Sequence, residues 1–92
     1  MKLKAPPQKQ LSPIEVWLSQ VNLQVTCMIV AEDESTREFH VVSLSMRGAQ
    51  REITGYLISQ GFEPVGRWEA AQVDGAGDEI EAVRKFRPAK RT

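Results

Sequence analysis

Residues 23–31 constrain the fold of this chain more than any other segment. Apolar side chains stand at every second position, and no glycine or proline interrupts the run. The alternating residues are Leu23, Val25, Cys27, Ile29 and Ala31. Because successive side chains of a β-strand point to opposite faces, this pattern predicts a strand with one buried face. The second face also becomes apolar toward its end, which favours a position inside a sheet rather than at its edge.

Three further segments show strand signals. A polar turn over 32–35 joins the first strand to a second over 36–44, where apolar residues alternate again, so the two are predicted to form a β-hairpin. A third strand is expected over 62–73 and a fourth over 79–87. The Gly-rich segment 74–78 between them predicts a turn.

The start of the chain predicts a short helix over about 13–20. Ser12 can cap its N-terminus, Pro13 suits the first turn, and Glu15 can complete a capping box. A helix of only two turns is unstable alone, so it must dock its apolar face on the rest of the fold.

A longer helix is predicted between the hairpin and the third strand. It begins at Ser43 or Ser45, either of which can cap it, and runs to Gln60, with Gly61 as a left-handed stop. Apolar side chains at three- and four-residue steps mark its buried face: Met46, Ala49, Ile53, Tyr56 and Leu57. Two glycines inside the helix lower its stability by about 1 kcal/mol each relative to alanine, unless they permit close packing.

These elements predict an α+β fold, in which a short N-terminal helix precedes a ββαββ unit. The main helix covers one face of a four-stranded, mostly antiparallel sheet. If this helix is a right-handed crossover that skips one strand, the sheet order is 2-1-3-4, numbering the four strands along the chain. The other face stays open unless the short helix or a second subunit covers it. We expect one domain over 12–88, a disordered leader over 1–11 and a loose basic tail over 89–92.

Charge is balanced overall but unevenly placed. The 92 residues contain twelve Lys and Arg against twelve Asp and Glu. Residues 1–10 hold three lysines and residues 84–92 hold five basic side chains, and neither segment contains an acid. All the acids therefore lie between Glu15 and Glu81, in the body of the chain. Basic ends of this kind can hold phosphates, or they can act as solubilising tails that sit over the acidic body.

Residue counts exclude several classes of protein. One cysteine rules out an intrachain disulfide and a cysteine-paired zinc site, and one histidine rules out a multi-histidine metal site. The sequence shows neither a secretory-signal pattern nor a membrane-length apolar run, so we expect a cytoplasmic protein with no membrane partner. Cys27 is expected to lie opposite His40 in the hairpin, where burial favours an inert thiol. Since no catalytic motif occurs, we expect no enzymatic activity, cofactor, metal or small-molecule substrate.

Two arginines at the start of the main helix are the clearest candidates for an anion site. Arg47 and Arg51 lie four residues apart on one helix face, where their charges repel each other and oppose the helix dipole. Either Glu52 and Glu38 neutralise them, or they bind a phosphate together with the helix amides. With the basic residues of the last strand and tail, they make up the predicted nucleic-acid-binding set: Arg47, Arg51, Arg84, Lys85, Arg87, Lys90 and Arg91.

The two tryptophans are the candidates for a protein interface. Trp17, on the short helix, is either a lid on the core or an exposed anchor. Trp68, on the third strand, points either into the core or onto the open sheet face.

Two functional hypotheses follow. The leading one is a small non-enzymatic module that binds a protein partner or a second copy of itself. The contact would involve the open sheet face, a sheet edge or the short helix. The alternative is a small nucleic-acid-binding protein. The acidic body counts against this alternative unless the carboxylates lie on the far side from the basic surface.

Overall fold

The computed structural model of the chain describes residues 12–71 and 79–90. The predicted leader, the predicted turn over 74–78 and Arg91 lie outside the described residues. Five strands and one helix follow one another along the chain: β1 (Ile14–Val21), β2 (Gln24–Ala31), β3 (Thr36–Phe39), α1 (Met46–Ser59), β4 (Phe62–Ala71) and β5 (Glu79–Pro88).

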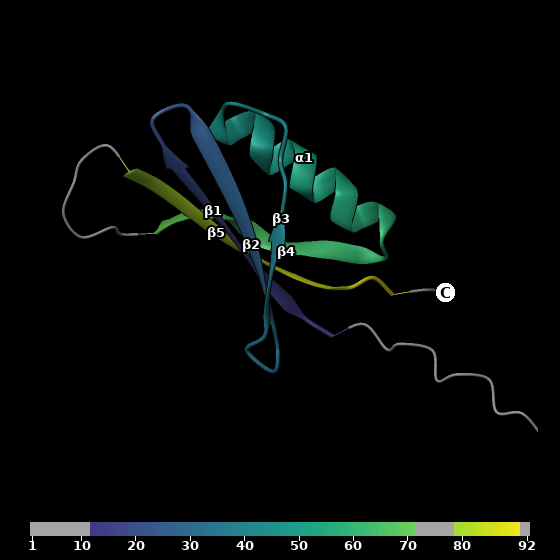
Figure 1. Ribbon diagram of the computed structural model, residues 1–92. Coiled ribbons are helices and arrows are strands. Elements are labelled where there is room, and N and C mark those ends of the chain that lie inside the picture. Colours follow the sequence, from purple (N-terminus) through teal and green to yellow (C-terminus); the bar gives the residue numbers. More distant parts are fainter. Residues whose placement is uncertain (1–11, 72–78, 91–92) are drawn as a thin grey trace, which may run out of the picture.

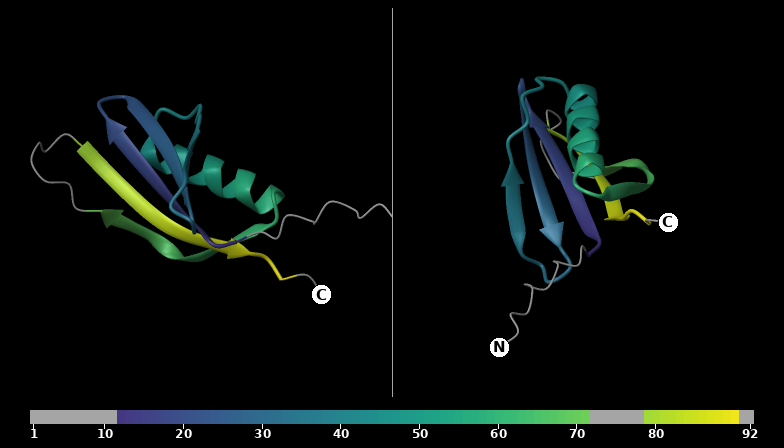
Figure 2. Two further views of the ribbon diagram at one scale, coloured as in Figure 1. Left: turned by 60° about the horizontal axis from the view of Figure 1, so that its bottom comes forward. Right: turned by 90° about the vertical axis from the view of Figure 1, so that its right-hand side faces the viewer.

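The fold is α+β, as predicted, with one helix on one face of an open antiparallel sheet (Figures 1 and 2). The strand order is β3-β2-β1-β5-β4, and each pair of neighbouring strands is antiparallel. Helix α1 connects one edge strand of the sheet to the other, so it crosses the sheet diagonally. The described residues place no element on the opposite face, which stays bare (Figure 2).

The predicted N-terminal helix over 13–20 is wrong, because this segment is strand β1. Its eight residues pair with β2 on one side and with β5 on the other. A helix cap contributes only about 1 kcal/mol, and the helix that it would start has two turns. As a strand, the same residues complete two ladders and bury Val16 and Leu18 fully in the core. In this segment the alternation of buried Val16 and Leu18 with less buried neighbours indicated the strand, whereas the helix-capping residues gave the wrong prediction.

The predicted four-stranded sheet with order 2-1-3-4 is also wrong, because β1 occupies the centre of a five-stranded sheet. Strand β5 pairs with β1 along its whole length, which leaves β4 at the edge. Strand β4 suits an edge, since Pro64 lacks an amide hydrogen and Gly66 has a φ of 69° within an irregularity of the ladder. The most apolar strand, β2, lies next to the centre rather than in it.

Register explains which side chains form the core. Val16, Leu18, Cys27 and Phe86 all point to the face that α1 covers, and each is essentially inaccessible to solvent. They meet three buried residues of the helix, at the predicted three- and four-residue steps: Ala49, Ile53 and Leu57. This single layer between helix and sheet is the hydrophobic core of the described chain.

Both ends of α1 agree with the predicted signals. Ser45 is the N-cap, and its hydroxyl accepts a 3.0 Å hydrogen bond from the Gly48 amide. After the last turn, Gly61 adopts a φ of 97°, a left-handed conformation that glycine reaches without strain.

Strand β3 is shorter than the predicted strand over 36–44 and ends at Phe39. The amides of Val42 and Ser43 donate hydrogen bonds of 2.9–3.0 Å to the carboxylate of Glu52 on α1. These hydrogen bonds hold residues 42–43 against α1 instead of in the sheet beside β2. In the hairpin, Cys27 pairs with Phe39 rather than with His40, so the predicted pairing was one residue out of register.

Candidate functional site

A groove of about 480 Å³ lies between the outer side of α1 and the edge of the sheet formed by β4 and β5. We call it the arginine groove. Eight residues line it: Arg47, Gln50, Arg51, Thr54, Gly55, Ile58, Trp68 and Arg84. Three of them are arginines, and none of the described lining residues is an acid. The groove therefore brings together part of the predicted nucleic-acid-binding set from two distant segments of the chain.

Arg47 and Arg51 contribute the charge of the helix. Both are exposed, they lie one turn apart on the same side of α1, and the first turn of the helix contains no acid. Neither predicted neutralising partner is available to them. The Glu52 carboxylate accepts hydrogen bonds from backbone amides. Glu38 lies opposite Met28, on the face of the sheet that α1 does not cover. Across the described ranges, neither arginine forms an ion pair.

Arg84 contributes the third guanidinium from strand β5. It stands opposite Val16, on the face of the sheet that α1 covers. Its Nη2 donates to the carbonyl oxygen of Gly66, and its Cζ lies 5.9 Å from the centroid of the Phe86 ring. Its Nε is buried and has no hydrogen-bond partner among the described residues. The guanidinium is thus held in place by a carbonyl and an aromatic ring, neither of which neutralises its charge.

Trp68 forms part of the groove wall while it also supports the core. The indole is half-buried, and its ring centroid lies 6.3 Å from that of Phe86 in an edge-on arrangement. It packs against the core on the helix side. Of the two predicted orientations, the structure has the one directed toward the core, with the indole also reaching the groove.

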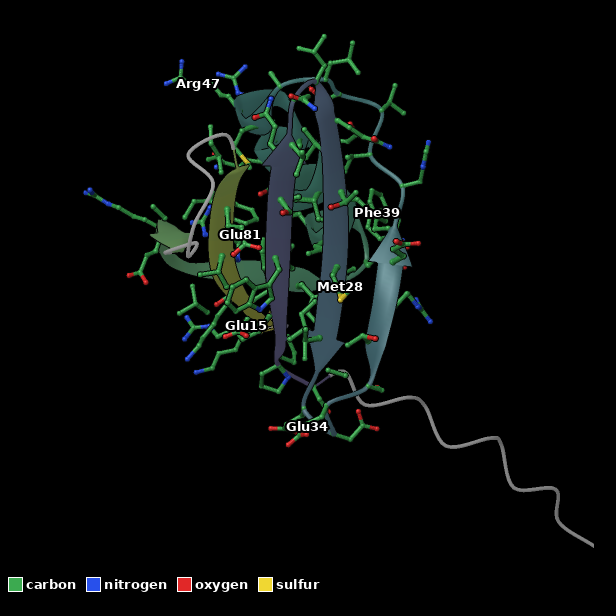
Figure 3. All side chains as sticks on the ribbon, turned by 60° about the vertical axis from the view of Figure 1, so that its left-hand side comes forward. Glu15, Met28, Glu34, Phe39, Arg47 and Glu81 are labelled. Carbon is green, nitrogen blue, oxygen red and sulfur yellow. The ribbon has the colours of Figure 1, made fainter. Side chains whose placement is uncertain are left out.

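Trp17 lies on the opposite, bare face of the sheet. Its Nε1 donates a 2.8 Å hydrogen bond to Glu15, and its strand neighbours on this face are Met28 and Val83. Carboxylates surround this apolar centre, and Figure 3 shows Glu15 and Glu81 on the near face of the sheet with α1 behind it. Because the two tryptophans lie on opposite faces, they do not form a common protein-binding surface.

The other described residues of the predicted basic set, Lys85, Arg87 and Lys90, lie outside the arginine groove. Lys85 points to the bare face, opposite Glu15. Arg87 forms a 2.6 Å ion pair with Glu63, the one ion pair found across residues 12–71 and 79–90. Lys90 is exposed in the segment that follows β5. Of the six members of the predicted set that the structure describes, Arg47, Arg51 and Arg84 share a site and the other three do not.

Sequence reasoning missed the part of the groove that lies beyond the arginines. Thr54, Gly55 and Ile58 continue along α1 on the side that carries Arg47 and Arg51, since steps of three, four and seven residues return to one helix face. Extending the same helical periodicity beyond Arg51 would have identified Thr54, Gly55 and Ile58 from the sequence. The contribution of Arg84 could not be found in this way, because it depends on where β5 lies in the sheet.

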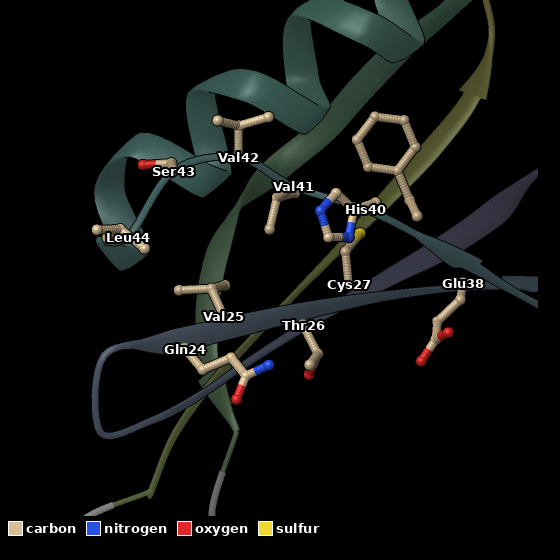
Figure 4. Close-up of a pocket in the computed structure, with 11 residues that line it drawn as sticks. Gln24, Val25, Thr26, Cys27, Glu38, His40, Val41, Val42, Ser43 and Leu44 are labelled. Atoms are coloured by element: carbon tan, nitrogen blue, oxygen red, sulfur yellow. The ribbon is translucent and has the colours of Figure 1, made fainter.

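Cys27 and His40 line a second hollow of about 510 Å³, between β2 and the segment that leads from β3 to α1 (Figure 4). His40 is exposed, whereas Cys27 is only 1% exposed. Burial, with a smaller contribution from the charge of Glu52, raises the pKa of Cys27 from 9.0 to about 12. The thiol is therefore protonated at neutral pH and is not a nucleophile there.

The described part of the chain contains no group of three or more His, Cys, Asp or Glu side chains placed to hold a metal ion. None of its helices has the length and apolar character needed to cross a membrane.

Comparison of the chain with protein-family models, curated proteins and solved structures gives no match. What the chain binds must therefore be inferred from the chemistry of the groove itself.

Proposed function

We propose that this chain is a non-enzymatic binding module that holds the phosphate backbone of a nucleic acid in the arginine groove. One observation carries the proposal: three guanidinium groups from two separate elements line one groove, and no acid is found among its described lining residues. Arginine suits this role because its planar fork of donors matches phosphate oxygens and it stays charged at all physiological pH values.

The distribution of charge supports the proposal despite the net charge of zero. Glu15, Glu38 and Glu81 belong to the bare face, on the far side of the sheet from α1. Glu52 is turned toward backbone amides, and Glu63 is paired with Arg87. Glu15 and Glu69 line a neighbouring hollow that Arg84 also borders, so these two acids lie beside the groove rather than within it. This arrangement supports phosphate binding in the groove itself.

Binding should be tested with a fluorescein-labelled oligonucleotide of mixed sequence, followed by anisotropy at low and then moderate salt. We expect affinity to fall as salt rises, with a log–log slope of about −2 for three phosphate contacts on a single strand. Arg51→Gln should weaken affinity by roughly tenfold to a hundredfold, since a hydrogen bond to a charged group contributes about 1.5–3 kcal/mol. It should also flatten the slope by about 0.7.

Arg37→Gln is the matched control, because Arg37 is an exposed arginine of β3 that does not line the groove. If both variants weaken binding equally, attraction is due to overall charge and the groove is not the site. If the wild-type protein does not bind at low salt, where even weak phosphate contacts are detectable, the proposal is wrong.

A second candidate function is the binding of a protein partner, or of a second copy, on the bare sheet face. The half-buried Trp17 supports it, since it lies beside Met28 and Val83 at the centre of this face. The acids around this centre would favour a partner with a basic rim. The short helix that was expected to offer a third docking surface does not exist, since those residues form β1.

A further inference from the structure

We infer that the arginine groove binds single-stranded nucleic acid, with phosphates at the end near Arg47 and an unpaired base at the end near Ile58. This inference rests on the proposed function and names the form of nucleic acid that the groove accepts. It depends on a change in the groove's chemistry along the axis of α1.

The charged side chains of the helix lie at one end of the groove. Arg47 and Arg51 belong to the first half of α1, whereas Gly55 and Ile58 belong to the second half. At a rise of about 1.5 Å per residue, Arg51 and Ile58 are separated by about 10 Å along the helix axis. A phosphate and a base can therefore occupy different parts of the same groove.

The second end of the groove has an apolar surface with free space above it. Gly55 carries no side chain, and a Cβ atom placed there would meet nothing within 4 Å apart from the adjoining backbone of α1. Ile58 is 54% exposed at this end. The half-buried indole of Trp68 belongs to the lining of the groove as a whole. Single-strand-binding proteins combine a positively charged groove with aromatic side chains on which bases stack. Trp68 is the aromatic side chain of this lining, and Ile58 adds apolar surface.

A duplex would contact the arginines of the groove but not its apolar end. Its bases are paired and stacked inside the double helix, so mainly phosphates would reach the groove, and the apolar end would stay uncovered. A polyphosphate without bases would leave the same end empty.

The experiment compares three fluorescein-labelled probes at one low salt concentration: a ten-nucleotide oligothymidine, an abasic strand of the same length, and a ten-base-pair duplex. We expect oligothymidine to bind about tenfold more tightly than the abasic strand, because contact between a base and the groove adds to the phosphate contacts. The duplex should bind more weakly than oligothymidine.

Ile58→Ser removes an apolar contact from the proposed base end while leaving all three arginines in place. It should lower the affinity for oligothymidine and leave that for the abasic strand unchanged. Ile80→Ser is the matched control, since Ile80 is also 54% exposed but does not line the groove. Trp68 is not substituted, because its contact with Phe86 supports the core.

The results distinguish a failure of base binding from a failure of phosphate binding in the groove. If the abasic strand binds as tightly as oligothymidine, or the duplex binds most tightly, and Arg51→Gln still weakens binding, the groove holds phosphates but no base. The inference is then wrong and the proposed function stands. If no probe binds, or Arg51→Gln has no effect on any of them, the proposed function fails as well.

Discussion

At the scale of single residues, environment determines what Cys27 and the arginines can do. The lone cysteine is buried beside an apolar layer, so it is a core residue rather than a reactive one. Arg84 is fixed by the carbonyl of Gly66 and the ring of Phe86, without a carboxylate partner among the described residues. The residue types alone predicted the inert thiol, because Cys27 lies on the most apolar face in the chain.

Cys27 should resist alkylation in the native protein. Because its pKa is raised to about 12, the thiolate is scarce between pH 7 and pH 9, and burial also blocks the reagent. Iodoacetamide labelling, followed by mass spectrometry, should be slow across this range and fast once guanidinium chloride unfolds the chain. Rapid labelling of the folded protein at pH 7 would contradict the burial of this side chain.

At the scale of elements, local signals predicted α1 correctly and β1 incorrectly. Ser45, Gly61 and the apolar steps between them all favour the same helix, and the tertiary structure agrees with them. In β1 the local signals conflict, since Ser12 to Glu15 resembles a helix start while Val16 and Leu18 alternate. Two neighbouring strands decide between them, and neither neighbour is visible from the segment itself.

The two glycines of α1 should respond differently to alanine. Gly55→Ala should raise the free energy of unfolding by about 0.5–1 kcal/mol, because open space surrounds its Cα and alanine is the better helix former. Gly48→Ala is the control, since its Cβ would press on the side chain of Ser43 and approach the capping hydroxyl of Ser45. It should gain nothing or lose stability. Urea unfolding followed by circular dichroism measures both, and equal gains at the two positions would contradict this account.

At the scale of the whole molecule, the sheet separates two surfaces of opposite character. The face covered by α1 bears the arginine groove, and the bare face bears Trp17 among carboxylates. The balanced charge of the sequence is therefore unevenly distributed: three arginines line the groove, whereas carboxylates outnumber Lys85 around Trp17 on the bare face. On this arrangement, nucleic acid and a basic protein partner would occupy opposite faces of the domain.

Trp17→Ala tests whether the two faces act independently. Because Trp17 lies on the bare face, its removal should leave the affinity for oligothymidine unchanged within about twofold, as distant sites rarely couple. If the bare face also joins copies of the chain, sedimentation velocity should show weaker self-association in this variant. A large loss of oligonucleotide affinity in a variant that remains folded would show that the two faces are not separate.

Periodicity and capping residues were sufficient to predict the α+β class, the long helix, the hairpin and the two strands that follow the helix, because these depend on contacts between residues close in the chain. They also predicted Arg47 and Arg51 as a pair, since a four-residue step determines their common helix face. Only the tertiary structure decided that β1 is the central strand, that β5 lies beside it, and that Arg84 and Trp68 reach the same groove. The pairing of β1 with β5 joins residues from 58 (Val21 with Glu79) to 72 (Ile14 with Phe86) positions apart, and such pairing leaves no local pattern in the sequence.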